Sequence, residues 1–217
     1  MARRKVSNPL ALAVLSLLTE RPMHPYEMSS TLRERAKEAS IKLNYGSLYS
    51  VVEALQRHGL IEIHETVREG RRPERTVYAI TDAGRTEFVD WLSELLAMPV
   101  KEYTQFEAAL SLMPGLPPDE VTRLLQVRRT RLEVELIGGK AVREEMTRQG
   151  LPELFVIEDE YVQAIRRAEL EFVDRLIARI KDGSLGGVDV WRQAHETGEL
   201  PTEADWKRAE VKLRRVE

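Results

Sequence analysis

Small and hydroxyl-bearing residues gather in the stretch NYGSLYS, at the start of a predicted helix. Its polar and small members are Asn44, Tyr45, Gly46, Ser47, Tyr49 and Ser50. Amide and hydroxyl groups of this kind hydrogen-bond phosphate oxygens and base edges. The N–H groups at a helix start also favour an anion. Small residues let the helix end approach a surface closely, so the stretch predicts a helix whose first turn contacts a polyanion.

A second group of residues suited to binding phosphate is basic. Four arginines stand in and beside the turn REGRRPER: Arg68, Arg71, Arg72 and Arg75. Lys42 lies just before the predicted helix. A lone run of charge is most often a solvated turn tip, but near such a helix these side chains become candidates for phosphate or minor-groove contacts. Glu69 and Glu74 weaken the positive charge of the turn.

Several kinds of chemistry find no support in the sequence. It contains no Cys, which excludes a disulfide framework, a thiolate nucleophile and Cys-based metal sites. The four His residues show no metal-ligand spacing, and helix capping suffices to explain His24 and His58. No nucleophile elbow, phosphate loop or dinucleotide fingerprint occurs. We therefore expect no enzyme activity, no metal and no cofactor.

Three helices must position the polar stretch. We predict them over about 9–19, 25–37 and 44–58, the first beginning at Asn8 and Pro9. The third helix has an apolar back formed by Leu48, Val52 and Leu55. Its end is marked by a glycine in the left-handed conformation, Gly59, and by the apolar residue after it.

A β-hairpin is predicted next. Ile61, Ile63 and Val67 alternate with polar residues, which is the period of a strand, and TVYAI returns as a second strand. The turn between the strands carries the arginines. Three helices and a hairpin within about 75 residues are the element order of a winged helix-turn-helix, whose third helix enters the major groove of DNA.

The remainder of the chain is predicted to be helical. After a helix starting at Thr81 and Asp82, long helices cover about 119–148 and 154–181. The second of these carries an apolar row that predicts a partner helix: Tyr161, Ile165, Ala168, Phe172, Leu176 and Ile180. Phe88 and Trp91 could line an effector pocket, but ordinary core packing is the favoured interpretation. Trp191 and Trp206 indicate that the tail docks onto another part of the chain.

Charge is distributed unevenly over the 217 residues. Residues 1–84 hold 13 Lys and Arg against 10 Asp and Glu, whereas residues 85–217 hold 20 against 26. This is compatible with a polyanion partner for the first part. The basic residues Arg3, Arg4 and Lys5 suit a flexible arm or a solvated terminus equally well. The apolar run after them is too short for a membrane span and lacks a cleavage site, so we expect a buried helix and a cytoplasmic protein.

Three segments together resemble the PadR family of bacterial transcriptional regulators. They are Pro25-Tyr26-Glu27 at the second helix, Gly46-Ser47-Leu48-Tyr49 on the third, and YAITDAG over residues 78–84. Many family members have Gly where this chain has Pro25. Many also have Pro where it has Ser50, which leaves the operator sequence open.

The resemblance implies a fold that is mainly α with a small β-hairpin. A winged helix-turn-helix DNA-binding domain over residues 1–85 would precede a helical domain at 86–182 and a tail at 183–217. In the family, the C-terminal domain is helical, antiparallel and dimerising. The resemblance also implies a homodimer that represses a nearby operator on double-stranded DNA and, in some members, is relieved by a small-molecule effector. The alternatives are a protein–protein adaptor that keeps the winged fold without DNA binding, and a ligand carrier.

Overall fold

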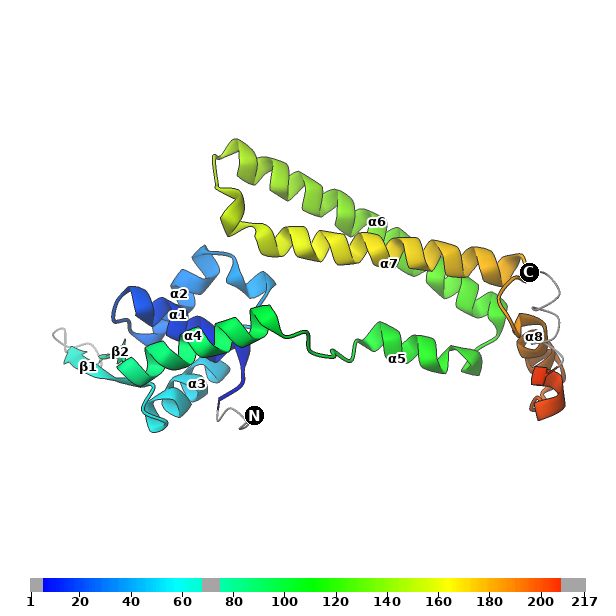
Figure 1. Cartoon of the computed structure of the whole chain (residues 1–217). Coiled ribbons are helices and arrows are strands. Elements are labelled where there is room, and N and C mark those ends of the chain that lie inside the picture. Colours follow the sequence, from blue (N-terminus) through cyan, green and yellow to red (C-terminus); the bar gives the residue numbers. More distant parts are fainter. Residues whose placement is uncertain (1–5, 68–74, 208–217) are drawn as a thin grey trace. The chain divides into compact units, whose positions relative to one another are not determined.

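The structure, a computed structural model, describes residues 6–67 and 75–207. The chain forms two compact units, Met1–Lys101 and Glu102–Glu217. Figure 1 labels the α-helices and the strands of both. The elements of the first unit are α1 (Pro9–Glu20), α2 (Pro25–Glu34), the short 3-10 helix η1 (Lys37–Ala39), α3 (Tyr45–Arg57), β1 (Ile61–Val67), β2 (Arg75–Ile80) and α4 (Asp82–Ala97). Three helices followed by a hairpin confirm the predicted winged helix-turn-helix.

The core of the first unit is built around α1, which is apolar on nearly all sides. Leu10, Val14 and Leu15 are fully buried. The side chain of Asn8 begins this helix by accepting a hydrogen bond of 2.9 Å from the Leu10 N–H. The predicted back of α3 packs into the same core, formed by Leu48, Val52 and Leu55. Burial of this apolar stripe therefore turns the polar side of α3 outward.

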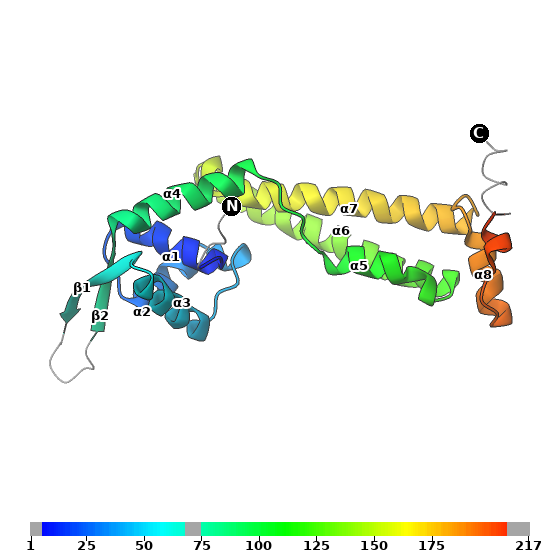
Figure 2. The same cartoon turned by 60° about the horizontal axis from the view of Figure 1, so that its bottom comes forward.

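The hairpin is antiparallel, running from the pair Ile61–Ile80 to the pair Val67–Arg75. It projects from the helices of the first unit (Figure 2). The register shifts between Ile63 and Glu65, so the simple alternation predicted for this strand is wrong. Ile61 is buried, whereas Ile63 is 53% exposed. Backbone hydrogen bonds of 3.0 Å in both directions between Met23 and Tyr78 tie the hairpin to the start of α2.

The junction between α3, the hairpin and α4 depends on a close backbone approach. Gly59 has a φ of 70° and ends α3, as predicted. The Thr81 N–H donates to the Leu60 carbonyl at 3.1 Å, and the Thr81 hydroxyl accepts the Gly84 N–H at 3.1 Å. A Cβ on Gly84 would meet that same Leu60 carbonyl oxygen closer than 3.0 Å. Only glycine fits here without a movement of the backbone.

The compact units divide after residue 101, whereas the sequence placed the boundary after residue 85. The physical reason is Trp91, which is 4% exposed and joins the core around α1. Phe88 packs against the same core. Helix α4 therefore belongs to the first unit rather than to the C-terminal helices.

The second unit is helical throughout its described part. It contains α5 (Gln105–Leu112), η2 (Met113–Gly115), α6 (Pro118–Arg148), η3 (Glu153–Phe155), α7 (Ile157–Lys181) and α8 (Val188–Thr197). Helices α6 and α7 form a long antiparallel pair (Figure 1). Their shared core includes Val121, Leu125, Val173 and Ile177. Both long helices were predicted, with starts displaced by one and three residues.

Two helices of this unit, α5 and α8, were not predicted. The hydroxyl of Thr104 caps α5 by accepting the Glu107 N–H at 3.2 Å, and Thr104-x-x-Glu107 is a capping-box spacing that could have revealed it. Helix α8 docks on the start of α6. There the Trp191 Nε1–H donates to the Leu116 carbonyl at 2.8 Å, and Arg192 pairs with Asp119 at 2.9 Å. The docking inferred from Trp191 is thus confirmed.

Replacing either of two adjacent glycines in α6 by Ala should change the stability of the second unit in opposite directions. A Cβ on Gly138 would meet no atom within 4 Å, whereas one on Gly139 would overlap the side-chain amide of Gln163, which is 5% exposed. We expect Gly138→Ala to stabilise the second unit by about 0.5–1 kcal/mol and Gly139→Ala to destabilise it by about 1–3 kcal/mol. Hydrogen exchange of α6 and α7 measures both changes. Adding Gln163→Ala to Gly139→Ala should recover part of the loss, and equal effects of the two glycine variants would refute this packing.

Candidate nucleic-acid interface

The first turns of α3 present small polar groups on an exposed surface. Gly46, Tyr49 and Ser50 are exposed, and Ser47 is half-buried. Tyr49 is 45% exposed, so its hydroxyl is accessible. The side chain of Tyr45 lies outside what the structure describes. The predicted polar residues with described side chains therefore lie together on the side of α3 opposite the core.

Two of these side chains already have local hydrogen bonds. Oδ1 of Asn44 accepts the Ser47 N–H at 2.7 Å and caps α3. The Ser50 hydroxyl donates to the Gly46 carbonyl at 3.0 Å. The amide nitrogen of Asn44 remains a donor, and the Ser50 oxygen retains acceptor capacity. Asn44 thus both starts the helix and offers N–H groups at its tip.

A shallow hollow of about 540 Å³ opens on this side of α3. We call it the α3 hollow. Its lining comprises Asn8, Asn44, Gly46, Ser47, Ser50, Val51 and Ala54. Four of these residues were predicted from sequence to contact DNA. Asn8 was not, because nothing local in the sequence shows that the start of α1 lies beside the start of α3.

The basic residues flank the hairpin and α3. Lys42 is exposed just before α3, and Arg75 is exposed at the first position of β2. Val67 and Arg75 form the last described pair of the hairpin. Arg68, Arg71 and Arg72 lie outside the described residues. In the sequence they lie between the two strands.

His24 is a structural residue beside this surface. Its Nδ1 accepts the Tyr26 N–H at 3.1 Å and caps α2. Partial burial and then the nearby charge of Arg75 lower the pKa of His24, while Glu27 acts weakly in the opposite direction. Protonation would convert Nδ1 into a donor facing another donor. Capping therefore requires the neutral imidazole, as the sequence interpretation of His24 anticipated.

Because its pKa is lowered on folding, His24 makes stability depend on pH. As pH falls below about 6.5, the unfolded chain binds a proton that the folded chain resists, so stability decreases. The stabilisation that depends on neutral His24 is fully present above about pH 6.5. It is lost as the pH falls toward the lower pKa that His24 has in the folded chain. Replacing His24 by Asn retains a capping oxygen without the titration. We expect the urea midpoint of this Asn variant to change less between pH 7.5 and 5.5 than that of the parent. Equal changes would exclude His24 as the source of the pH dependence.

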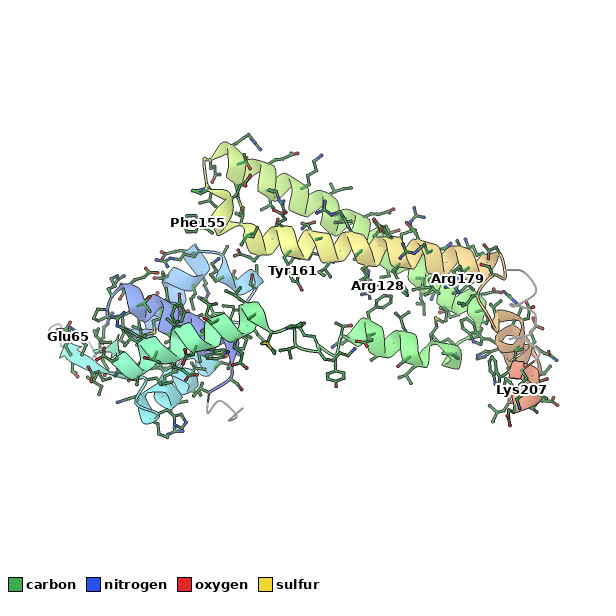
Figure 3. The ribbon with its side chains drawn as sticks, in the orientation of Figure 1. Glu65, Arg128, Phe155, Tyr161, Arg179 and Lys207 are labelled. Atoms are coloured by element: carbon green, nitrogen blue, oxygen red, sulfur yellow. The ribbon has the colours of Figure 1, made fainter. Side chains whose placement is uncertain are left out.

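The apolar row predicted on α7 divides into two parts. Tyr161 and Ile165 are 68% and 51% exposed, and Ala168 and Phe172 are exposed too. Figure 3 shows Tyr161 projecting from α7 away from α6. Leu176 and Ile180 instead lie in the core of the second unit. Only the first four residues are accessible to a second chain.

A cavity of about 650 Å³ lies in the second unit between α5, α6 and α7. Its walls are mostly apolar, and Arg128, Arg131 and Arg166 line it together with two glutamates. The Arg128 guanidinium lies 3.7 Å from the centre of the Phe106 ring and pairs with Glu169. Figure 3 labels Arg128. Phe88 and Trp91 do not line this cavity, and core packing accounts for both.

Within residues 6–67 and 75–207, no group of His, Asp and Glu could hold a metal ion. None of the helices in that part is long and apolar enough to span a membrane.

Part of the chain is similar to a known protein family. Residues 14–90 match the model of the transcriptional regulator PadR-like family. This segment contains the α3 residues, the hairpin and Gly84. No curated protein sequence matches the chain.

Solved structures share its fold at low sequence identity. Bacillus subtilis PadR in complex with operator DNA has a TM-score of 0.61 and 18% identity, covering 80% of this chain and 98% of that one. The same protein in complex with p-coumaric acid has a TM-score of 0.63 and 17% identity, covering 79% and 98%. The Vibrio cholerae virulence activator AphA has a TM-score of 0.59 and 16% identity, covering 80% and 98%.

Proposed function

Because residues 14–90 match the model of the transcriptional regulator PadR-like family, we propose that this protein binds operator DNA as a homodimeric transcriptional repressor. The observation that carries the proposal is the exposed side of α3. There Asn44, Gly46, Ser47 and Ser50 line one hollow, and the apolar back of the helix is buried. Small polar groups on the first turns of a third helix suit a helix end that enters a major groove.

Each subunit would contact DNA through two elements. The start of α3 would lie in the major groove, with Asn44 and the serines facing phosphates and base edges. Arg68, Arg71, Arg72 and Arg75, at and beside the hairpin turn, would contact the flanking backbone or minor groove, and Lys42 another phosphate. Two-fold symmetry then implies a palindromic operator with half-sites about one helical turn apart, or a multiple of it.

Exposed apolar side chains on α7 support the homodimer. Tyr161, Ile165, Ala168 and Phe172 lie on accessible positions of one long helix. A contiguous apolar surface of this kind typically marks a protein–protein contact. Leu176 and Ile180 drop out of the proposed interface because they are buried within the chain itself.

We further propose that a small-molecule effector causes the protein to dissociate from the operator. The cavity between α5, α6 and α7 has the size and apolar walls of a ligand site. Arg128 and Arg166 pair with glutamates of the same lining, which leaves Arg131 as the candidate to orient an anion. A solved structure of similar fold is a complex with p-coumaric acid. This cavity suits an effector better than Phe88 and Trp91, because Trp91 is buried in the first core.

Variants of the hairpin and of α3 should have different effects on DNA binding. Arg71→Ala combined with Arg72→Ala should weaken binding to all duplexes. The slope of log affinity against log salt should fall by about one for each phosphate that the variant no longer neutralises. Ser47→Ala should mainly change the preference among base sequences. Fluorescence anisotropy with duplexes from the chain's own upstream region measures both effects.

A matched control is Arg175→Ala combined with Lys181→Ala, which removes the same charge from α7. It should leave the salt slope unchanged. Hairpin and α3 variants that bind the operator as tightly as the parent, with the same slope, would contradict the assignment of these surfaces. A parent chain that binds no duplex would favour a protein–protein adaptor.

A further inference from the structure

A second cavity of the second unit, of about 440 Å³, opens beside α8. Its volume lies within the range of small-molecule sites. The lining is mostly apolar and aromatic and includes Pro114, Trp191, Leu200, Pro201 and Trp206. We call this cavity the α8 pocket. Its lining shares no residue with that of the cavity between α5, α6 and α7, so the two are separate sites.

The chain after α8 turns back and brings a second tryptophan to this pocket. Gly198, with a φ of 74°, follows the end of α8. The N–H and the hydroxyl of Thr202 donate to the Asp205 carboxylate at 2.8 and 2.6 Å, and this cap starts the helical turn that carries Trp206. The Trp206 ring packs over the start of α8, where a Cβ on Gly187 would lie 3.0 Å from its Cζ3 atom. Local capping and one close approach thus place the ring at the pocket.

Anchoring of the tail accounts for Trp191 but not for the open part of Trp206. Trp191 is 6% exposed, and its indole N–H donates to the Leu116 carbonyl. Trp206 lines the same pocket and is 43% exposed. An aromatic ring that lines a cavity and stays this open to solvent is available for contact with a ligand.

Apart from the indole rings, the polar side chains of the pocket are acceptors. Within residues 6–67 and 75–207, the Glu199 carboxylate has no hydrogen-bond or ion-pair partner. Nε2 of His195 lies 2.9 Å from the Pro114 carbonyl oxygen, which only accepts, so this nitrogen carries a proton and Nδ1 of the neutral ring is an acceptor. No Lys or Arg is among the described residues that line the pocket. The pocket therefore suits a cation rather than an anion.

We infer that the α8 pocket binds a small organic cation with an apolar body, such as an arylalkylammonium. Trp206 contacts the charged group through the face of its ring, because an aromatic face attracts a cation. Glu199 supplies the opposite charge, and the prolines and Leu200 cover the apolar body. The inference goes beyond the proposed function and does not depend on DNA binding.

Calorimetric titration of the full chain with benzyltrimethylammonium tests the inference. We expect saturable binding of one cation per chain, with a dissociation constant of about 1 mM or lower. Benzenesulfonate, an aromatic anion of similar size, should bind about ten-fold more weakly or not at all, because it would face the Glu199 carboxylate.

Substitutions separate the charge of the pocket from its aromatic ring. Glu199→Gln should weaken cation binding about three-fold, since the carboxylate is exposed. Trp206→Leu should weaken it about five-fold, whereas Trp206→Phe, which retains an aromatic face, should have a smaller effect. Melting temperature, measured on the same samples, shows whether each variant keeps the parent fold.

Glu196→Gln is the matched control, because Glu196 is an exposed residue of α8 that does not line the pocket. It should retain the parent affinity for the cation at about 150 mM salt, which screens charges that are not in contact. A second control, Phe106→Leu, alters the cavity between α5, α6 and α7 and should also bind the cation like the parent.

Three results would overturn the inference. They are the absence of saturable cation binding, equal affinity for benzenesulfonate, and parent-like affinity in Glu199→Gln. Loss of cation binding in Phe106→Leu alone would also overturn it and assign the cation to the other cavity. If Trp206→Leu lowers the melting temperature, Glu199→Gln decides, because it removes a charge and no apolar contact. A chain that binds the cation but no operator would overturn the proposed function alone.

Discussion

A chain carrying Asn44→Asp is expected to fold at least as stably as the parent and to lose about a hundred-fold in operator affinity. Oδ1 of Asn44 accepts the Ser47 N–H at 2.7 Å, and a carboxylate oxygen serves equally well in that position. A negative charge at the start of α3 also suits the helix dipole. In the proposed dimer bound to DNA, however, the same charge would face phosphates from each subunit and repel them.

The comparison with Asn44→Ser isolates this charge effect. Serine keeps the cap and adds no charge, so its affinity should lie between those of the parent and the Asp variant. Unfolding by urea and anisotropy at one fixed salt concentration measure stability and affinity. An Asp variant that binds the operator as tightly as the parent would show that α3 does not face the phosphate backbone.

Gly84→Ala should destabilise the first unit by about 3 kcal/mol. The new methyl group would overlap the carbonyl oxygen of Leu60 and crowd Ile80. That carbonyl also accepts the Thr81 N–H, so relieving the overlap disturbs the start of α4 and the end of the hairpin. The expected result is faster hydrogen exchange throughout α1, α3 and α4.

Gly115→Ala is a matched control, because a Cβ there meets no atom within 4 Å and the residue lies in the second unit. It should leave exchange in α1 unchanged. Parent-like protection of α1 in the Gly84 variant would mean that the junction tolerates a side chain and that the close approach does not hold the elements together.

Local signals were enough to predict most elements of the first unit. Asn8 before Pro9 marks one helix start, Gly59 marks one helix end, and the arginine-rich turn separates two strands. The polar residues at the start of α3 were found because the apolar back of that helix fixes which side is exposed. At these positions burial of the apolar back determines which side is exposed, so a local pattern is informative.

Features that depend on distant contacts could not be derived in this way. The start of α1 meets the α3 hollow only through the tertiary fold, which is why Asn8 was missed. The burial of Trp91 in the first core depends on how α4 packs against α1, and the exposure of Ile63 depends on a register shift in the hairpin. Which residues of the apolar row on α7 are exposed and which are buried depends likewise on where the shared core of the second unit ends.

The most direct test of the account is binding of the full chain to a duplex from its own upstream region that contains an inverted repeat. We predict two chains per duplex, protection of two half-sites about one helical turn or a multiple of it apart, and a steep loss of affinity between about 50 and 200 mM salt. Equal affinity for a scrambled duplex of the same composition, or one chain per duplex, would contradict it.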